Sequence, residues 1–435
     1  MKKIDIHSTF IPGQEITDPD QFAGRRNNIA QAIKALCRPG TSILVYGERG
    51  VGKTSFVEMV KLMAQGQVEL LYRHKFKFLV PKEGFNYQVI SIECDEDVKN
   101  TDKVLQRLIT SPEGISGLLE PRINKIETTV KDHFALNLFK KIIGFDSSTE
   151  EKSVKETIKE MSIYELFTNL IILITQKILK PEEGLLIVID EFDRVNENSK
   201  ISSLIKTLSK NKVKFLISGI AESYFELLEQ HSSIERQLFQ GKIKIEPMLH
   251  EEIEDIFNLV SKNTEGAIKF KNNIKEEIIK RCGGYPYYVH LFGQIALDHF
   301  CKIYGIEARA NIGKEHLLEG LKDFAQYEPK LEKIYLQLVG NDPERELLLK
   351  ALSSQIPNRI HQDMIFNYCR KREMTKTKQL LAYFLSMRNP KILERIEKDF
   401  ITFSDPLFKI YASTRSPILI EKTPNGFQLP ASVAF

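Results

Sequence analysis

Residues 42–55 read SILVYGERGVGKTS. The first five are largely apolar, which is typical of a buried strand, and the stretch after Lys53 has helical spacing. Between them, Gly47–Thr54 matches G-x-x-x-x-G-K-[ST] without deviation. The glycines let the backbone curl so that successive N–H groups face a phosphate, and the following helix adds its dipole. The segment therefore predicts a phosphate-binding turn in an α/β domain.

A second apolar stretch ends in two carboxylates: residues 185–191 read LLIVIDE. In a nucleotide site built on the phosphate loop, Lys53 reaches the β- and γ-phosphates and the Thr54 hydroxyl binds Mg²⁺. Asp190 then holds the same Mg²⁺, usually through water, and Glu191 polarises the attacking water as a base. These residues predict hydrolysis of a bound nucleotide rather than binding alone.

The first 250 residues alternate short apolar runs with helical patterns, which predicts a mainly parallel five-stranded sheet with helices on both faces. We expect a hairpin between residues 76–80 and 87–94, and an insertion beside the core at about 111–160. The expected strands are 42–46, 87–94, 185–189, 213–218 and 242–246.

Beyond Pro247 the pattern is helical, and one helix is expected to stop at Gly283 and the next to start at Pro286. After about Gly340, three helical stretches are followed by an alternating segment, 399–408, which outlines a winged helix. The predicted domains are therefore a P-loop ATPase core over 1–247, an all-helical lid over 248–340 and a winged helix over 341–435.

Composition excludes several classes of protein. The chain carries 62 Lys+Arg against 58 Asp+Glu, and 42% of its residues are hydrophobic, which is ordinary for a globular protein. Its 5 cysteines form no CxxC pair, so neither a disulfide framework nor a zinc site is expected. No secretory leader or membrane-spanning stretch is recognisable, so we expect a cytoplasmic protein without a membrane partner.

With both motifs in place, the chain resembles AAA+-like P-loop ATPases of the STAND and origin-recognition (archaeal) group. Residues 22–26, FAGRR, are similar to the family's F-x-G-R box near the adenine, which makes Phe22 and Arg25 candidate base contacts; a capped helix start is the alternative. Ser218 lies at the family's sensor 1 position, where a polar side chain senses the γ-phosphate. The alternative is that Ser218 is only the end of a strand.

The resemblance continues towards the C-terminus. Arg236 lies in a segment similar to the one that presents an arginine finger to a neighbouring subunit, although an ordinary ion-paired arginine is the alternative. Pro286 belongs to a G-x-P element that reports the nucleotide to the lid, and no arginine follows in residues 287–300 to act as sensor 2. The implied nucleotide-binding residues are Gly47, Glu48, Arg49, Gly50, Val51, Gly52, Lys53, Thr54, Ser55, Phe22, Arg25, Ser218 and Pro286.

Any attraction to nucleic acid is expected at the C-terminus, where residues 341–435 hold 15 Lys+Arg and 10 Asp+Glu, a net 15 − 10 = +5. A basic cluster spans the end of one expected helix and the start of the next, which Thr375 is expected to cap. Such a helix start can read a major groove, and a solvated basic face is the alternative. The cluster comprises Arg370, Lys371, Arg372, Lys376 and Lys378, and the expected reading residues are Thr375, Lys376, Thr377 and Lys378.

The resemblance implies a switch that binds ATP with Mg²⁺, hydrolyses it to ADP and phosphate, and assembles into a homo-oligomer in the ATP state. Its output is control of an effector protein or of double-stranded DNA, in defence or signalling. The alternative is a DNA-binding, loader-like factor in which ATP is mainly structural. Glu191 discriminates between them, because only the switch needs a base.

Overall fold

In the computed structural model the chain divides into two compact units, residues 15–246 and residues 1–14 with 247–435. We describe each unit by itself. The structure describes residues 9–67, 69–122, 161–196, 199–209, 212–221, 223–227, 235–238, 240–305, 309–326, 328–355, 360–423 and 426–429.

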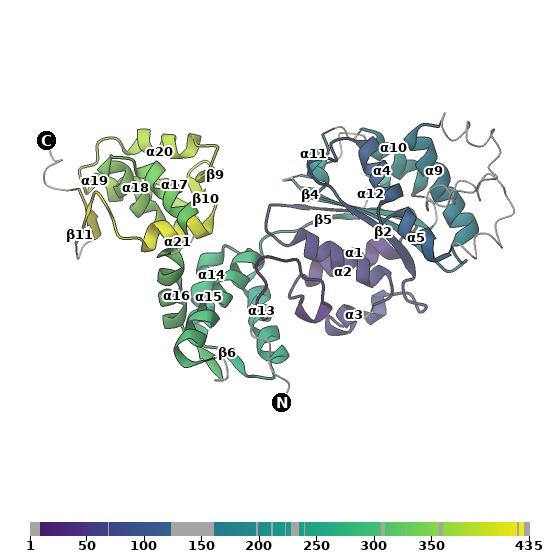
Figure 1. Ribbon diagram of the computed structural model, residues 1–435, viewed down its shortest axis with the longest axis horizontal. Helices are drawn as coiled ribbons and strands as arrows, with labels where there is room; N and C mark the ends of the chain where they lie inside the picture. Colours follow the sequence, from purple (N-terminus) through teal and green to yellow (C-terminus); the bar gives the residue numbers. More distant parts are fainter. Residues whose placement is uncertain are drawn as a thin grey trace. The chain divides into compact units, whose positions relative to one another are not determined.

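The first unit is built on a parallel five-stranded sheet of order β2-β3-β4-β1-β5. The sheet and all five strand positions confirm the prediction. Its central strands are largely apolar because helices cover both faces, as Figure 1 shows for α1 and α2 on one face and α4, α9 and α10 on the other. The strands are β1 (Ile43–Gly47), β2 (Tyr87–Glu93), β3 (Gly184–Asp190), β4 (Val213–Ile220) and β5 (Lys242–Lys244).

Helix α4 buries an apolar stripe formed by Val104, Leu105 and Leu108 in the core of this unit. The α-helices are α1 (Arg26–Cys37), α2 (Lys53–Ala64), α3 (Glu69–Arg73), α4 (Thr101–Thr110), α5 (Ile115–Leu119), α9 (Ile163–Leu173), α10 (Ser199–Leu208), α11 (Tyr224–Leu227) and α12 (Glu235–Leu238). Shorter 3₁₀ turns are η2 (Pro19–Gln21), η3 (Lys77–Leu79), η4 (Glu120–Arg122) and η6 (Phe192–Arg194), and η5 (Ile174–Ile178) is a π-helix that continues α9.

One expectation for this unit was wrong. No hairpin forms before β2: Lys77–Leu79 is a 3₁₀ turn, and within the described sheet β2 pairs only with β3, in parallel. The insertion at about 111–160 stays a prediction; its first part includes α5, whose Ile115 and Leu119 are fully buried in the core. The rest of that expected insertion, residues 123–160, lies outside the described residues.

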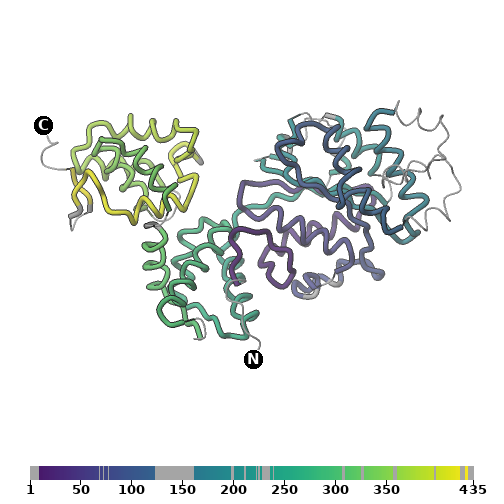
Figure 2. The backbone as a smooth tube through the Cα atoms, viewed as in Figure 1, coloured from purple at the N-terminus to yellow at the C-terminus, as the bar shows by residue number. Residues whose placement is uncertain are grey.

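The second unit begins with helices that pack around the N-terminal segment. The Phe10 ring makes edge contacts with Phe257, Phe270 and His290, and in Figure 2 the purple start of the trace runs among the teal helices. The region is not all-helical, because two short parallel strands pair there. The elements are α13 (His250–Asn263), β6 (Ile268–Phe270), α14 (Asn272–Cys282), α15 (Pro286–Tyr304), β7 (Ala310–Ile312) and α16 (Lys314–Gln326).

The C-terminal part combines helices with an antiparallel three-stranded sheet of order β8-β10-β9. The expected strand pair at 399–408 was placed wrongly: β10 pairs with the preceding β9, and Pro406 starts a helix because proline fits the first helical position. The elements are α17 (Pro329–Val339), α18 (Pro343–Ser353), β8 (Ile360–His361), α19 (Gln362–Arg370), α20 (Thr377–Ser386), β9 (Leu393–Glu397), β10 (Phe400–Phe403), α21 (Pro406–Thr414), β11 (Glu421–Thr423) and β12 (Gly426–Gln428).

The sequence predicted that Thr375 caps helix α20, but the structure shows no such cap. The helix starts at Thr377 after Lys376, and the Thr375 hydroxyl instead donates to Glu344 at 3.0 Å. The Lys376 N–H donates to the other oxygen of Glu344, also at 3.0 Å. The carboxylate of α18 thus satisfies one backbone N–H at the start of α20 that has no partner within the helix.

Two fully buried ionisable residues of α18 fix the end of the chain. The Glu346 carboxylate accepts the Tyr335 hydroxyl at 2.6 Å and the N–H groups of residues 418, 419 and 420 at 2.8, 2.6 and 3.2 Å. Lys350 donates to the carbonyls of Ala412 (2.7 Å) and Arg415. Because the two charges are enclosed with their hydrogen-bond partners, they hold the final segment against the helices.

The turn between α14 and α15 offers a matched test of steric fit. Gly283 (φ +62°) and Gly284 (φ +87°) are both left-handed, but only a Cβ at Gly284 meets Pro247 Cβ at 2.7 Å and the Met248 carbonyl at 2.9 Å. We expect Gly283→Ala to cost about 1–2 kcal/mol for its backbone conformation and Gly284→Ala clearly more. Urea unfolding of the full chain, followed by circular dichroism, measures both. Equal losses would mean that the surroundings of Gly284 relax freely.

Candidate active site

The phosphate loop joins the end of β1 to the start of α2, as predicted. Gly47 has φ +152° and lies so close to β5 that an added Cβ would be 2.2 Å from the Ile245 carbonyl oxygen. Gly50 and Gly52 are also left-handed, with φ +82° and +93°. These positions tolerate glycine far better than other residues, which lets the loop turn sharply into the N-terminus of α2.

The Lys53 ammonium lies along this loop. It donates to the carbonyls of Gly47 at 3.1 Å and Glu48 at 2.8 Å. Partial burial lowers its pKa, while the carboxylates of Asp193, Asp190 and Glu191 act in the opposite direction. The lysine of the first motif and the carboxylates of the second therefore feel one another's charge, as a single site requires.

Asp190 ends β3 and is largely buried, with 7% of its surface exposed. Its Oδ1 accepts the Glu191 backbone N–H at 2.8 Å and the Ser218 hydroxyl from β4. Ser218 in turn is the register partner of Val45 in β1. The neighbouring strands thus bring Asp190 and the predicted sensor position into direct contact.

Glu191 leaves the sheet in a left-handed conformation, with φ +52°. Its Oε2 lies 2.7 Å from Arg194 Nε, an ion pair without the alignment of a hydrogen bond. Desolvation raises the pKa of Glu191, as do the nearby acids, whereas Arg194 lowers it. A carboxylate held near other acids at a strand end has the chemistry of a general base.

The F-x-G-R box is folded against the phosphate loop. Arg25 is left-handed (φ +58°) and only 5% exposed, and its guanidinium donates to the carbonyls of Val51 at 2.6 Å and Glu246 at 2.5 Å. Phe22 is buried, and its carbonyl accepts from Arg73 at 2.8 Å. Arg25 therefore positions the loop itself; contact of either residue with a base stays a prediction.

The remaining predicted residues lie in different places. Thr54 and Ser55 are in the first turn of α2, and Ser55 Oγ accepts the Ile16 N–H at 2.9 Å. Arg236 is exposed on the short helix α12. Pro286 opens α15 in the other unit, so its contact with nucleotide, like the finger role of Arg236, stays a prediction.

His290 follows Pro286 on α15, and its side chain is buried. Its Nδ1 accepts the Ile11 N–H at 3.5 Å, and burial lowers its pKa to about 4.

Sequence reasoning gave two residues near the site too little weight. Asp193 and Arg194 were not among the residues predicted for the site, yet Asp193 Oδ1 accepts the Ile220 N–H at 2.7 Å and Arg194 pairs with Glu191. Asp193 thereby ties the turn after β3 to the end of β4. Their position three and four residues after Asp190 was the only available signal.

The oxygen donors fit a Mg²⁺ ion bound together with phosphates. Thr54 supplies a hydroxyl at the start of α2, and Asp190 supplies a carboxylate at the end of β3; Mg²⁺ prefers such hard oxygen ligands and keeps several waters. Across the described residues, no group of three His, Cys, Asp or Glu could hold a metal by itself. The site therefore suits a metal that phosphate helps to hold.

The model of the KAP family P-loop domain matches residues 22–266, more than half of the chain. The chain belongs to the KAP family of P-loop NTPases. No curated protein matches it. The matched range includes Lys53 and Asp190. Membership of this family supports hydrolysis of nucleoside triphosphates in general.

Several solved structures are similar at low identity. Cdc6p from Pyrobaculum aerophilum is 14% identical, with 94% of this chain and 97% of that one covered and a TM-score of 0.44. A Walker-type ATPase of Pyrococcus abyssi is 14% identical, with 92% and 98% covered and a TM-score of 0.45. The Aeropyrum pernix ORC1 protein in complex with DNA is 12% identical, with 90% and 92% covered and a TM-score of 0.40. At these scores the similarities define neither this chain's fold nor its function.

The structure also bears on membranes: in the described part of the chain, no helix has both the length and the apolar character needed to span a bilayer.

Arg25 offers a test of how the phosphate loop is positioned. We expect Arg25→Met to weaken nucleotide binding at least about tenfold, because two backbone carbonyls lose a buried charged donor, each hydrogen bond being worth roughly 1.5–3 kcal/mol. Arg26→Met is the matched control, since Arg26 is exposed and lies over the Phe76 ring at 5.3 Å. Titration with a fluorescent nucleotide compares them, and wild-type affinity in Arg25→Met would contradict the assignment.

The pH profile of hydrolysis tests the environment of Glu191. A base acts only when ionised, so hydrolysis should fall as the pH drops through a pKa raised above the ordinary glutamate value. Arg194→Gln removes the cation that lowers this pKa, so the acidic limb should move to higher pH. Lys200→Gln, which removes an exposed pair with Asp102, should leave the limb in place. An unmoved limb in Arg194→Gln would argue against Glu191 as the base.

Proposed function

We propose that the chain is an ATP-hydrolysing molecular switch, with ATP as its nucleotide and Mg²⁺ as its metal. The observation that carries the proposal is the joint placement of Lys53 with Asp190 and Glu191, close enough for their charges to shift the pKa of Lys53. Thr54 and Asp190 would hold the metal, which when bound neutralises charge on the phosphates. Membership of a P-loop NTPase family supports the reaction class.

In the proposed reaction Glu191 takes a proton from a water molecule while the water oxygen attacks the γ-phosphorus. The bond between the γ-phosphorus and the β-phosphate oxygen breaks, which leaves ADP and phosphate. Lys53 lies where the β- and γ-phosphates are held. The hydroxyl of Ser218 donates to Asp190 and so keeps that carboxylate in one orientation. Arg236, exposed on α12, is the residue we propose to complete the site of a neighbouring subunit.

The second unit is proposed to carry the output of the switch. We assign residues 248–340 as a helical lid that responds through Pro286, and residues 341–435 as a winged helix. The order α18, β8, α19, α20, β9, β10 with its antiparallel three-stranded sheet supports the winged helix. Such an architecture would allow the lid to close, the subunits to assemble and an effector to be controlled, in defence or signalling.

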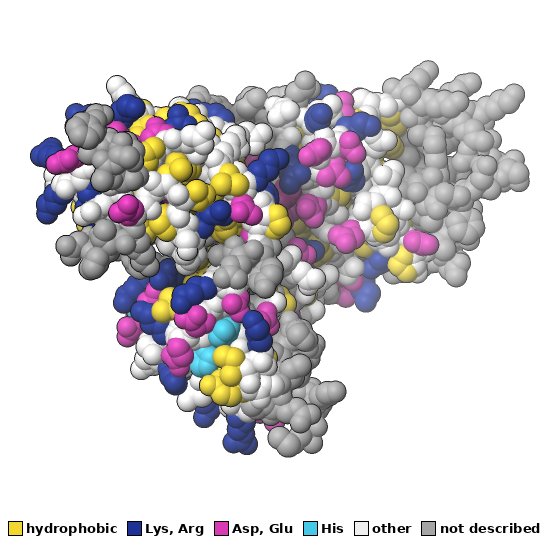
Figure 3. Space-filling model, turned by 60° about the vertical axis from the view of Figure 1, so that its left-hand side comes forward, with side chains coloured by type: hydrophobic (Ala, Val, Ile, Leu, Met, Phe, Trp, Pro, Cys, Tyr) yellow, Lys and Arg dark blue, Asp and Glu magenta, His cyan; other side chains and the backbone are white. Residues whose placement is uncertain are grey.

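Binding of double-stranded DNA is the second candidate function, favoured by exposed cations around the junction of α19 and α20. Arg370, Lys371, Lys376 and Lys378 are exposed there. Arg372 is engaged internally, because it donates to the carbonyls of Phe427 at 2.7 Å and Tyr368 at 3.2 Å. Thr377 is buried, so it does not read bases. On the face of the molecule in Figure 3, basic and acidic side chains are interspersed.

One experiment separates the two functions: hydrolysis of ATP and GTP, with and without duplex DNA, with assembly size followed in the same samples. We expect Glu191→Gln to lose at least about 100-fold in hydrolysis while it still binds ATP and assembles, because only the base is removed. Lys53→Ala should lose binding and assembly together.

Wild-type hydrolysis in Glu191→Gln would contradict the switch. A duplex affinity that falls with salt, together with no turnover in the wild type and no effect of Lys53→Ala on DNA, would instead support the DNA-binding factor.

A further inference from the structure

The two most exposed large hydrophobic side chains among the described residues are those of Phe78 and Leu249, at 80% and 68%. Phe78 lies in η3 of the first unit, and Leu249 immediately precedes α13 of the second unit. A single exposed hydrophobic side chain is ordinary in a globular protein. These two are different because each lies in a part of the chain that carries exposed charges of mainly one sign, and the two signs are opposite.

Phe78 belongs to what we call the basic surface, formed by η3 with its flanking residues and by α1. Neither of the contributing stretches, residues 21–47 and 70–82, contains an Asp or Glu, and Glu83 is the first acid after the second stretch. The stretches pack together, because Arg26 lies over the Phe76 ring at 5.3 Å and Cys37 Sγ donates to the Leu79 carbonyl at 3.4 Å. The exposed cations of these stretches include Arg26, Lys34, Arg38, Lys75 and Lys82.

Leu249 belongs to what we call the acidic surface, at the start of α13. Residues 245–261 contain no Lys or Arg. Glu251 and Asp255 are both exposed, and a spacing of four residues places them on the same side of the helix. Burial raises the pKa of Asp255, and the charges of three other acids of α13 raise it further. A cation brought beside these acids would relieve their repulsion.

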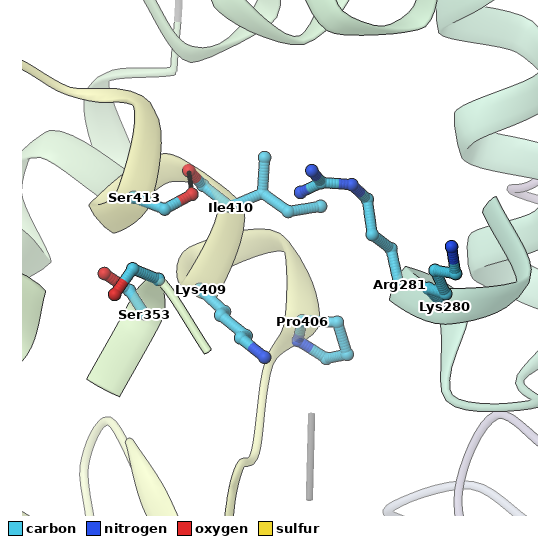
Figure 4. Close-up of a pocket in the computed structure, with 8 residues that line it drawn as sticks. Lys280, Arg281, Ser353, Pro406, Lys409, Ile410 and Ser413 are labelled. Atoms are coloured by element: carbon cyan, nitrogen blue, oxygen red, sulfur yellow. Dashed lines mark hydrogen bonds between the residues drawn. The ribbon is translucent and has the colours of Figure 1, made fainter. Parts of the chain in front are cut away.

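The recess between α14 and α21 offers no comparable surface. Lys280, Arg281 and Lys409 line it, but Figure 4 shows that their charged ends do not converge. The basic and acidic surfaces, by contrast, each combine charges of one sign with an exposed hydrophobic side chain.

We propose that the basic surface of one copy of this chain docks on the acidic surface of a second copy, with Phe78 and Leu249 at the centre of the contact. Protein interfaces commonly gain most of their binding energy from a few apolar anchors, while surrounding charges select the partner and speed association. A nucleic acid would match the basic surface alone, whereas a second copy uses both surfaces.

The contact is head-to-tail, because the two surfaces differ and each copy keeps one of each kind for a further copy. The proposal rests on the assembly step of the proposed switch and names the surfaces that carry it.

The test follows assembly of the full chain by sedimentation velocity with ATP and Mg²⁺. One variant reverses the basic surface (Lys75→Glu with Lys82→Glu), and another reverses the acidic surface (Glu251→Lys with Asp255→Lys). Each variant alone should assemble at least about tenfold more weakly than the wild type, because like charges then meet. An equimolar mixture of the two should assemble as the wild type does, because the two altered surfaces fit each other and the two unaltered surfaces also fit.

The matched control is Lys103→Glu with Lys206→Glu, which makes the same change in net charge at exposed lysines of α4 and α10. Its assembly should stay within twofold of the wild type. Phe78→Ser and Leu249→Ser remove the apolar anchors without changing the charge, and each should weaken assembly at least about tenfold. Because both side chains are exposed, these variants should keep the fold.

The proposal is overturned if the wild type stays monomeric, if both charge-reversed variants assemble as the wild type does, or if their mixture assembles no better than either alone. It is equally overturned if Lys75→Glu with Lys82→Glu loses binding to single-stranded DNA while its assembly is unchanged, which would assign the basic surface to nucleic acid. Hydrolysis by Glu191→Gln tests the switch separately: wild-type hydrolysis there would contradict the switch, and restored assembly in the mixture would still support the interface.

Discussion

Strand β4 pairs with β1 on one side and with β3 on the other, and the candidate site depends on this double pairing. Val45 of β1 lies beside Ser218, and Ser218 reaches Asp190 at the end of β3. Because parallel strands end at the same edge, the phosphate loop after β1 and the acids after β3 arrive together. A slip of one residue in either pairing would turn Ser218 to the opposite face and separate these groups.

The site concentrates charge that the fold must hold in place. Partial burial makes the Lys53 ammonium easier to deprotonate, and the acids beside it oppose that effect. The same burial makes Glu191 harder to ionise. The charged form of Lys53 is supported by the acids beside it, and the charged form of Glu191 is supported by Arg194. Arg25 positions the phosphate loop by hydrogen bonds, and Gly47 does so by packing closely against Ile245.

The sheet could be predicted from sequence because its strands are continuous apolar runs, and the Gly47–Thr54 motif is unmistakable. The errors arose where local pattern and tertiary context disagree. Residues 76–80 look like a strand, yet Lys77–Leu79 forms a 3₁₀ turn, and in the described sheet β2 pairs with β3 alone. Thr375 has cap chemistry, but a carboxylate 31 residues away takes its hydroxyl.

Side-chain partners across the fold were beyond prediction for the same reason. No local pattern indicates that Arg25 donates to the carbonyl of Val51 or that Arg194 pairs with Glu191. Spacing along the chain predicts which elements form and that the loops after parallel strands meet at one edge of the sheet. It does not predict which charges meet once those elements pack.

The central claim is that Lys53 and Asp190 belong to one metal-dependent nucleotide site. The most direct measurement is the affinity for a fluorescent ATP analogue with Mg²⁺ and with EDTA, in the wild type and in Asp190→Asn. The account predicts that Mg²⁺ strengthens binding to the wild type at least about tenfold and to Asp190→Asn far less, because the carboxylate no longer helps to hold the ion. An equal effect of Mg²⁺ on both proteins would contradict it.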